Sequence, residues 1–279
     1  MDTPRALVLE QDQIAAYQRN GAVHLASVFD TSWLEFLRKA ADVALACPGP
    51  YAQDHSIASE SGGYYSDLQM SKRIPDFLTF AQQSPVGEIA ATLMGSRRIN
   101  LLHDAMWLKE SGTSRRTPWH HDQPFYCMEG TQMCVVWIPL DDHPKEISLS
   151  CLKGSHCWGK RFRPERINGG WYDGYGSNDG FAAPPAVAEN PERFEVMCWD
   201  MHAGDCIVFQ GLTVHGSAGN LTGHRRLAVS LVLVGDDAVY VERQGEMQPN
   251  YVGNGLHPGE AIDNDYFPRL YYDNKLGST

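Results

Sequence analysis

A short segment of the sequence, TPWHHDQPFY at residues 117–126, places two histidines and an aspartate side by side. His120 and Asp122 are separated by one residue, so on an extended backbone their side chains leave the same face of the chain. His121 then points the other way, and we expect a structural role for it. An imidazole and a carboxylate on one face can bind one metal ion. The apolar run VFQGLTVH supplies a third ligand at its end, His215.

Two histidines and one carboxylate leave three positions open on an octahedral ion, the arrangement found in non-haem iron(II) oxygenases. Arg226 lies eleven residues after His215, at the head of the apolar run RLAVSLVLV. Its planar guanidinium can bind a carboxylate by two parallel hydrogen bonds. Ser217 can add a hydroxyl to the same carboxylate, whereas strand alternation turns Arg225 to the opposite face. The pattern predicts a metal centre with a carboxylate-binding site beside it.

The segments that must position these residues fall into two groups. Helical patterns dominate the first part: an amphipathic helix that ends near Gly21, a second helix capped by Asp30 or Thr31, and a third over residues 74–94 that is interrupted near Pro85. The later part consists of short apolar runs bounded by Gly, Pro, Asp or Asn. Such runs favour a β-sandwich or barrel over alternating βαβ units.

The ordered set of His120-x-Asp122, His215-Gly216-Ser217 and Arg226 resembles the phytanoyl-CoA dioxygenase family of Fe(II)/2-oxoglutarate-dependent oxygenases. The segments AYQRNGAVHLASVF, WIPLDD, KGSH and HAGDCIVFQGLTVHGSAGN support it, and the resemblance covers about residues 9–234. It implies a mainly β fold with flanking helices, built around a double-stranded β-helix, which is a jelly-roll core of the cupin type.

The same resemblance implies the cofactors and the residues that bind them. Fe(II) is expected as the metal, 2-oxoglutarate as the co-substrate and O2 as the oxidant. The expected iron ligands are His120, Asp122 and His215. The far carboxylate of 2-oxoglutarate is expected at Arg226 and Ser217. Two further residues can border this co-substrate, although each also has an ordinary interpretation as a packed or solvated residue: Trp137 and Lys109.

We expect a single domain over residues 1–279. It would comprise a helical N-terminal part to about residue 95, a jelly-roll core over about residues 96–240 and a C-terminal extension over residues 241–279. Residues 168–191 form a Gly- and Pro-rich excursion inside the strand region. That excursion is too long for an ordinary connection and is expected to be a functional lid or an added subdomain.

Composition narrows the choice of partner. The formal net charge of −11 argues against a nucleic-acid partner, which would need clustered lysines and arginines. The chain lacks an apolar run long enough to span a membrane and an N-terminal signal pattern, so we expect a cytoplasmic location. Seven scattered cysteines without a C-x-x-C pair indicate reduced thiols. A small-molecule substrate is expected, and the oligomeric state is not predicted.

One basic segment, KGSHCWGKRFRPER, stands out in this acidic chain and favours a small anionic substrate. The substrate could be amino-acid-like, a phosphonate or a natural-product intermediate, and no residue specifically indicates coenzyme A. A solvated face is the ordinary interpretation of such a cluster. The candidate substrate contacts are His156, Lys153, Arg161 and Arg163, together with the aromatic residues Trp119 and Phe125 beside the metal motif.

The expected reaction is hydroxylation of an unactivated C–H bond, with release of succinate and CO2. A halogenase would need the coordination position that Asp122 occupies. Desaturation, cyclisation and acyl-CoA hydroxylation remain alternatives within the same chemistry. Two alternatives come from other classes: a zinc-dependent hydrolase, which has no use for Arg226, and a non-catalytic jelly-roll module that keeps a metal as a structural pin.

Overall fold

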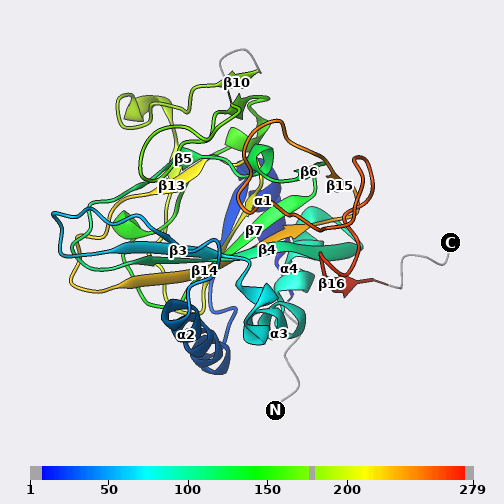
Figure 1. Cartoon of the computed structure of the whole chain (residues 1–279), viewed down its shortest axis with the longest axis horizontal. Coiled ribbons are helices and arrows are strands. Elements are labelled where there is room, and N and C mark those ends of the chain that lie inside the picture. Colours follow the sequence, from blue (N-terminus) through cyan, green and yellow to red (C-terminus); the bar gives the residue numbers. More distant parts are fainter. Residues whose placement is uncertain (1–7, 176–179, 274–279) are drawn as a thin grey trace.

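Two β-sheets and a layer of helices make up the structure, a computed structural model that describes residues 8–175 and 180–273. The smaller sheet lies over one face of the larger sheet, and helices α2, α3 and α4 lie on the other side (Figure 1). The architecture is mainly β with flanking helices and a jelly-roll core, as the sequence predicted.

The larger sheet runs in the order β1-β12-β7-β14-β4-β3-β2, and β16 also pairs with β4. Its strands are β1 (Ala22–Leu25), β2 (Gln53–Asp54), β3 (Tyr64–Leu68), β4 (Arg98–Lys109), β7 (Met133–Pro139), β12 (Cys206–Gln210), β14 (Arg226–Val234) and β16 (Arg269–Tyr272). Every pairing in this sheet is antiparallel.

The smaller sheet runs in the order β11-β8-β13-β5 and carries the predicted metal motif. Its strands are β5 (Thr117–His120), β8 (Ser150–Leu152), β11 (Val196–Met197) and β13 (His215–Ser217). Two further pairs stand apart: β6 (Met128–Glu129) with β15 (Val239–Tyr240), and β9 (Arg161–Phe162) with β10 (Phe181–Ala182). Short 3₁₀ helices connect several strands: Met70–Lys72, Gln123–Phe125, Lys145–Ile147, Ser155–Cys157 and Pro191–Arg193.

The helices begin and end close to the predicted points. They are α1 (Gln11–Asn20), α2 (Thr31–Ala46), α3 (Pro75–Gln83) and α4 (Val86–Met94). The Asp30 carboxylate caps α2 by accepting a 3.0 Å hydrogen bond from the Trp33 amide. Gly21 ends α1 in the left-handed conformation at φ 85°, which a residue without Cβ adopts at little cost.

Strand alternation divides the core into two layers. Leu227, Val229 and Leu231 of β14 pack with the helices in the larger apolar cluster. Ala228 and Val232 face the opposite way, into the cluster between the two sheets. Because the side-chain period of a strand is two, one strand covers the helical core and also lines the space between the sheets.

The larger sheet also draws strands from outside the predicted core range of residues 96–240. β2 and β3 come from the segment expected to be helical, and β16 comes from the C-terminal extension. The short run of β3, YYSDL, carries two polar residues and gave little apolar signal. Within the described residues, no helix combines the length and apolarity that crossing a bilayer requires.

Candidate active site

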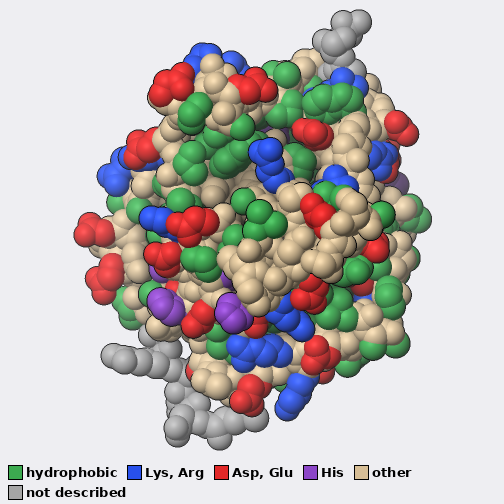
Figure 2. All heavy atoms as spheres, turned by 90° about the vertical axis from the view of Figure 1, so that its left-hand side faces the viewer, with side chains coloured by type: hydrophobic (Ala, Val, Ile, Leu, Met, Phe, Trp, Pro, Cys, Tyr) green, Lys and Arg blue, Asp and Glu red, His purple; other side chains and the backbone are tan. Residues whose placement is uncertain are grey.

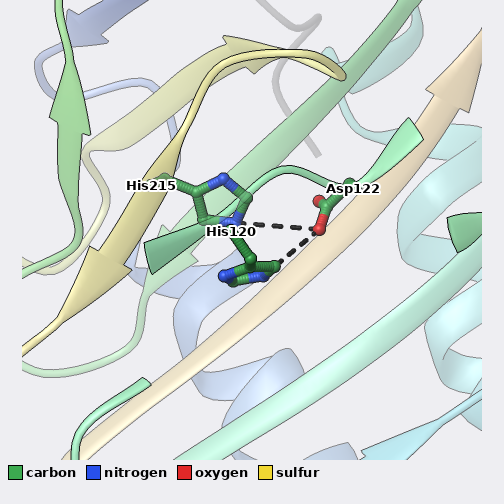
Figure 3. A group of neighbouring side chains, drawn as sticks. All are labelled: His120, Asp122 and His215. Atoms are coloured by element: carbon green, nitrogen blue, oxygen red, sulfur yellow. Dashed lines mark ion pairs between the residues drawn. The ribbon is translucent and has the colours of Figure 1, made fainter. Parts of the chain in front are cut away.

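The predicted metal ligands come together at the edge shared by β5 and β13. His120 ends β5, His215 begins β13, and the two residues pair directly across the sheet. Asp122 follows in the turn after β5. Its Oδ1 lies 3.4 Å from His120 Nε2 and 3.7 Å from His215 Nε2 (Figure 3). The three ligand atoms lie within 4.8 Å of one another.

Backbone carbonyls orient both imidazoles. His120 Nδ1 lies 2.8 Å from the Pro118 carbonyl, and His215 Nδ1 lies 3.0 Å from the Thr213 carbonyl. A carbonyl oxygen can only accept a hydrogen bond, so each Nδ1 carries the proton. Each Nε2 is directed at Asp122 and is the ring nitrogen left to bind a metal, which is how metal-binding histidines are commonly held.

The charges of the three groups suit a divalent cation. Burial alone would raise the pKa of Asp122, but His215 and His120 outweigh it and lower that pKa to about 2. Burial lowers the pKa of His215 to about 4. Adjacent ligand atoms on an octahedral ion with bonds of about 2.1 Å are about 3 Å apart. The two carboxylate–imidazole separations, 3.4 and 3.7 Å, are somewhat wider than this, and the three ligand atoms lie within 4.8 Å of one another, so small side-chain movements would close the site on a metal ion.

Two buried cations lie at one end of the cavity beside this centre. Arg226 begins β14 and is 2% exposed, and Lys109 ends β4 directly opposite it. Within the described residues neither has a carboxylate partner, and Arg226 Nε has no hydrogen-bond partner at all. Burial lowers the pKa of Arg226 to about 10 and holds the pKa of Lys109 well below its usual value. This end is short of negative charge, which fits the far carboxylate of 2-oxoglutarate.

Hydroxyl groups continue from Lys109 along the wall of the same end. Lys109 Nζ donates to Ser217 Oγ at 3.0 Å, Ser217 Oγ donates to Thr117 Oγ1 at 3.0 Å, and the Tyr64 hydroxyl lies 2.9 Å from Thr117 Oγ1. Trp137 lies against Arg226, with the guanidinium carbon 5.6 Å from the ring centroid. Ser217, Trp137 and Arg226 line the cavity, and Lys109 lies behind Ser217.

The opposite end of the cavity is aromatic and nearly free of charge. Phe125 and Tyr172 contact each other with their rings tilted by 52° and their centroids 4.4 Å apart, and the ring of His103 meets Tyr126 edge-on at 4.6 Å. Burial lowers the pKa of His103 to about 3, so its ring is neutral at ordinary pH. Elsewhere the cavity is lined by further residues, among them Tyr51, Gln53, His55, Glu165, Ile167 and Gln248.

Comparison with known proteins places the chain in a family. The family model for phytanoyl-CoA dioxygenase matches residues 17–228, which is most of the chain. The protein belongs to the phytanoyl-CoA dioxygenase family. Ectoine dioxygenase from Sphingopyxis alaskensis is a relative, 23% identical over 231 residues that cover 79% of this chain and 74% of that protein.

Solved structures show that the fold is shared. The 2-oxoglutarate-dependent carbocyclase SnoK from nogalamycin biosynthesis superposes with a TM-score of 0.73 at 20% identity, covering 94% of this chain and 96% of SnoK. The epimerase SnoN, in complex with Fe3+, α-ketoglutarate and nogalamycin RO, gives a TM-score of 0.72 at 24% identity, covering 93% and 98%. At identities below 25%, this likeness shows a shared fold and nothing more.

Family membership makes this phytanoyl-CoA dioxygenase homologue an Fe(II)/2-oxoglutarate-dependent dioxygenase, and it argues against the hydrolase and binding-module alternatives. When bound, iron and 2-oxoglutarate supply oxidation by O2, with the co-substrate converted to succinate and CO2. His120, Asp122 and His215 fit the iron, and the buried cations beside them, which lack a carboxylate partner among the described residues, fit the co-substrate.

The structure places only some of the predicted substrate contacts of this dioxygenase at the cavity. Phe125 lines the cavity. Trp119 instead packs against a separate apolar cluster with Phe162 and Val214. The sequence placed Trp119 at the substrate because of its nearness to the motif, but the pleat of β5 turns it away from His120.

The basic side chains of this segment do not line the cavity of the dioxygenase, contrary to the prediction, although its Pro164 and Glu165 do. Its side chains already have partners: Lys153 pairs with Glu195, Arg161 pairs with Glu129, His156 bonds to the Gln18 carbonyl, and Arg163 stacks on Trp171. Figure 2 shows acidic and basic side chains intermixed over one face of the molecule. Local pairing explains the cluster better than anion binding does.

The excursion at residues 168–191 contributes one wall of the dioxygenase's cavity. Tyr172 lines the cavity, Tyr175 is buried beside it, and Trp171 is partly exposed. Residues 176–179 of this predicted lid lie outside the described residues.

His103 and Tyr126 are lining residues that the sequence did not indicate. For His103 a signal existed, because Lys109, Trp107, Ala105 and His103 alternate along one face of a single strand.

Proposed function

We propose that this enzyme hydroxylates a C–H bond of a small metabolite whose polar groups near the iron are uncharged. His120, Asp122 and His215 hold the iron, while Arg226 and Ser217 bind the far carboxylate of 2-oxoglutarate. The observation that carries the proposal is a single cavity lined by Arg226 at one end, by the three ligands, and by an aromatic wall at the other end.

Each protein group in this proposal has a defined task. Asp122 stays ionised and neutralises part of the metal charge. The Pro118 and Thr213 carbonyls keep the two imidazole Nε2 atoms directed at the metal. Asp122 also occupies the position that a halide would need, which favours hydroxylation over halogenation. The rings of Phe125 and Tyr172, in contact with each other, exclude water from the face where the substrate binds.

The charge distribution argues for an uncharged substrate over the anionic one that the sequence favoured. Apart from Arg226, the described residues lining the cavity include no lysine or arginine, and Glu165 adds a carboxyl group to its wall. An anionic substrate would meet no cation there, and the phosphates of coenzyme A would lack partners. Neutral carbonyl, hydroxyl or amide groups suit the imidazole, phenol and amide side chains that are present.

The first experiment tests the metal and co-substrate sites without a substrate. Anaerobic protein is mixed with Fe(II) and 2-oxoglutarate, and the weak visible charge-transfer band of the chelate is recorded. We expect a band in the wild type that is lost in Asp122→Ala, weakened in Arg226→Ala and retained in Arg225→Ala, which changes a partly exposed neighbour. Iron bound without a band would refute the 2-oxoglutarate site.

The second experiment tests the substrate class. Succinate formation under air is measured with panels of neutral and anionic metabolites of matched size. We expect stimulation by neutral compounds and a product heavier by one oxygen atom. Stimulation confined to anionic compounds would refute the assignment of charge, and a product that has lost two hydrogens would identify a desaturase or a cyclase instead of a hydroxylase.

A further inference from the structure

One buried polar group at the aromatic end has a fixed orientation that the family chemistry does not explain. His103 lies on β4 and lines the cavity, yet it is only 3% exposed. Its Nδ1 is 2.8 Å from the hydroxyl of Tyr251, which comes from the C-terminal extension, outside the matched family domain. The ring is therefore held by a segment that the family model does not include.

The hydrogen bond to Tyr251 determines which ring nitrogen carries the proton. Tyr251 is 1% exposed, and burial raises its pKa well above the usual value, so its hydroxyl keeps its proton. Within the described residues, His103 Nδ1 is the one hydrogen-bond partner of that hydroxyl. A buried O–H left without an acceptor is costly, so Tyr251 donates and Nδ1 accepts. The neutral ring then carries its proton on Nε2.

The Nε2–H group is left available to a ligand. No side chain or carbonyl of the described residues bonds to Nε2, and Nε2 is not among the fully enclosed polar atoms that lack a partner. Tyr251 does not line the cavity, so the Nδ1 edge of the ring faces the extension and the Nε2 edge faces the cavity. A buried donor without a partner is expected to meet an acceptor in the functional complex.

The backbone conformation of Tyr251 indicates that this contact has a function. Tyr251 has φ 51°, in the left-handed region that residues with Cβ rarely adopt, and Asn254 Nδ2 holds its carbonyl at 2.9 Å. Such a conformation costs about 1 kcal/mol or more and is retained when the surrounding structure requires it. Here it directs the phenol at His103.

We infer that His103 Nε2–H binds a carbonyl oxygen of an uncharged, planar, ring-containing substrate, and that Tyr251 positions His103 for this contact. The planar ring is expected to pack against the wall formed by Phe125, Tyr126 and Tyr172, whose ring centroids lie 4.4 to 6.0 Å apart in successive pairs. This inference rests on the proposed function, because it names the substrate class of the same cavity.

The test uses three small probes of nearly equal size with the zinc-substituted protein and 2-oxoglutarate, which cannot turn over. Acetophenone offers a neutral carbonyl on a ring, ethylbenzene lacks the acceptor, and benzoate carries a charge. We expect acetophenone to bind about tenfold tighter than ethylbenzene, the size of one hydrogen bond, and benzoate to bind no better than ethylbenzene. Equal binding of acetophenone and ethylbenzene, including no detectable binding of either, would overturn the inference.

Nitrogen-15 NMR of the histidine rings tests the tautomer independently. The His103 signals are assigned by their absence in His103→Phe. We expect an unprotonated Nδ1 and a protonated Nε2 that shifts on addition of acetophenone. In Tyr251→Phe a mixture of tautomers is expected, and the preference for acetophenone should fall. A protonated Nδ1 in the wild type would contradict the assignment.

Matched variants separate this contact from general damage. Tyr240→Phe removes a hydroxyl from another buried tyrosine, in β15, that does not line the cavity, and it should leave probe binding unchanged. His103→Phe should abolish the preference for acetophenone while keeping the Fe(II)–2-oxoglutarate band. Loss of the band in the wild type would refute the proposed function, whereas a band without acetophenone preference would refute this inference alone.

Discussion

The two ends of the cavity are built differently. At the Arg226 end, two buried cations lack anionic partners, and hydroxyl groups link Lys109, Ser217 and Thr117. At the His103 end, rings and neutral imidazoles predominate, and the C-terminal extension supplies a supporting residue. Both ends share β4, on which Lys109 and His103 lie six residues and therefore about 20 Å apart.

The charged end is built for the co-substrate, which is the same whatever substrate is oxidised. The neutral end is built for the substrate, which can differ. Unpaired buried charge costs folding free energy, and it is retained only where a ligand of opposite charge compensates for it. The neutral end carries no such cost and can be altered by exchanging rings and hydrogen-bond donors. Its residues come from several segments, among them β3, β4, the turn after β5, residues 164–172 and the extension. Specificity can change there without disturbing the metal centre.

The largest effect is expected at the metal centre between the two ends. Asp122→Ala removes the ligand that both imidazoles face, so bound iron and succinate formation should each fall by at least about a hundredfold, more than is typical for a residue that merely supports a ligand. Iron content after gel filtration and succinate release measure this. His257→Gln, at an exposed position, is the control and should change neither. Full retention of iron in Asp122→Ala would exclude the ligand set.

Arg226→Met tests the charged end by two measurements: 2-oxoglutarate should bind more weakly, whereas the protein without 2-oxoglutarate should become more stable. The dissociation constant for 2-oxoglutarate should rise by about a hundredfold, because a desolvated, hydrogen-bonded charge pair is lost. Without 2-oxoglutarate, the free energy of unfolding should increase by on the order of 1 kcal/mol, because an unpaired buried cation is removed.

Arg225→Met serves as the control for Arg226→Met. The side chain of Arg225 is 41% exposed, and both quantities should stay near the wild-type values. A less stable Arg226→Met protein with unchanged 2-oxoglutarate affinity would show that Arg226 has a purely structural role.

Acidification should destabilise the metal-free protein through its buried imidazoles. Five histidines have a pKa lowered to about 4 or about 3 by burial: His55, His103, His121, His143 and His215. Between pH 6.5 and 4 the unfolded chain binds more protons than the folded protein, so the free energy of unfolding falls as the pH is lowered. Two groups among the described residues oppose this trend. Burial raises the pKa of Asp104 to about 6, and Asp122 outweighs the effect of burial on His120 and raises the pKa of that imidazole.

Urea unfolding at several pH values measures this trend. His143→Gln should reduce the slope by about one proton, because it removes one buried imidazole. A flat profile between pH 6.5 and 4 would mean that these rings stay protonated in the folded state.

The smallest effect is expected in the basic segment, outside both ends. Lys153→Ala breaks an exposed pair with Glu195 and should change the free energy of unfolding by less than about 1 kcal/mol. Glu195→Ala should give a similar value. Succinate formation with any stimulating substrate should stay unchanged in both. A large rise in the Michaelis constant for that substrate in Lys153→Ala alone would restore the basic segment as a substrate site.

Much of the metal centre could be predicted from the sequence because its information is local. The one-residue spacing of His120 and Asp122 and the run that ends at His215 specify direction along a strand, and alternation separates Arg226 from Arg225. The helix boundaries at Gly21 and Asp30 are likewise local, since they depend on backbone freedom and capping.

The substrate end could not be predicted because its contacts join distant segments. Tyr251 and His103 are 148 residues apart in the sequence, and no local pattern predicts that they are in contact. The substrate role predicted for the basic segment rested on a related difficulty. The acidic partners of Lys153 and Arg161 are 42 and 32 residues away, so a local stretch of sequence shows the positive charges without the carboxylates that pair with them. The face of β4 that His103 occupies becomes clear only from its alternation with Trp107 and Lys109.

The alternation of β4 limits how the gene for this protein can change. His103, Ala105, Trp107 and Lys109 face one way, while Met106 and Leu108 pack with the helices. Insertion or deletion of one codon inside this strand would exchange the two sets, sending Lys109 into the apolar layer and Leu108 toward the co-substrate. Changes of length are therefore tolerated in the surrounding loops, whereas β4 can vary only by substitution.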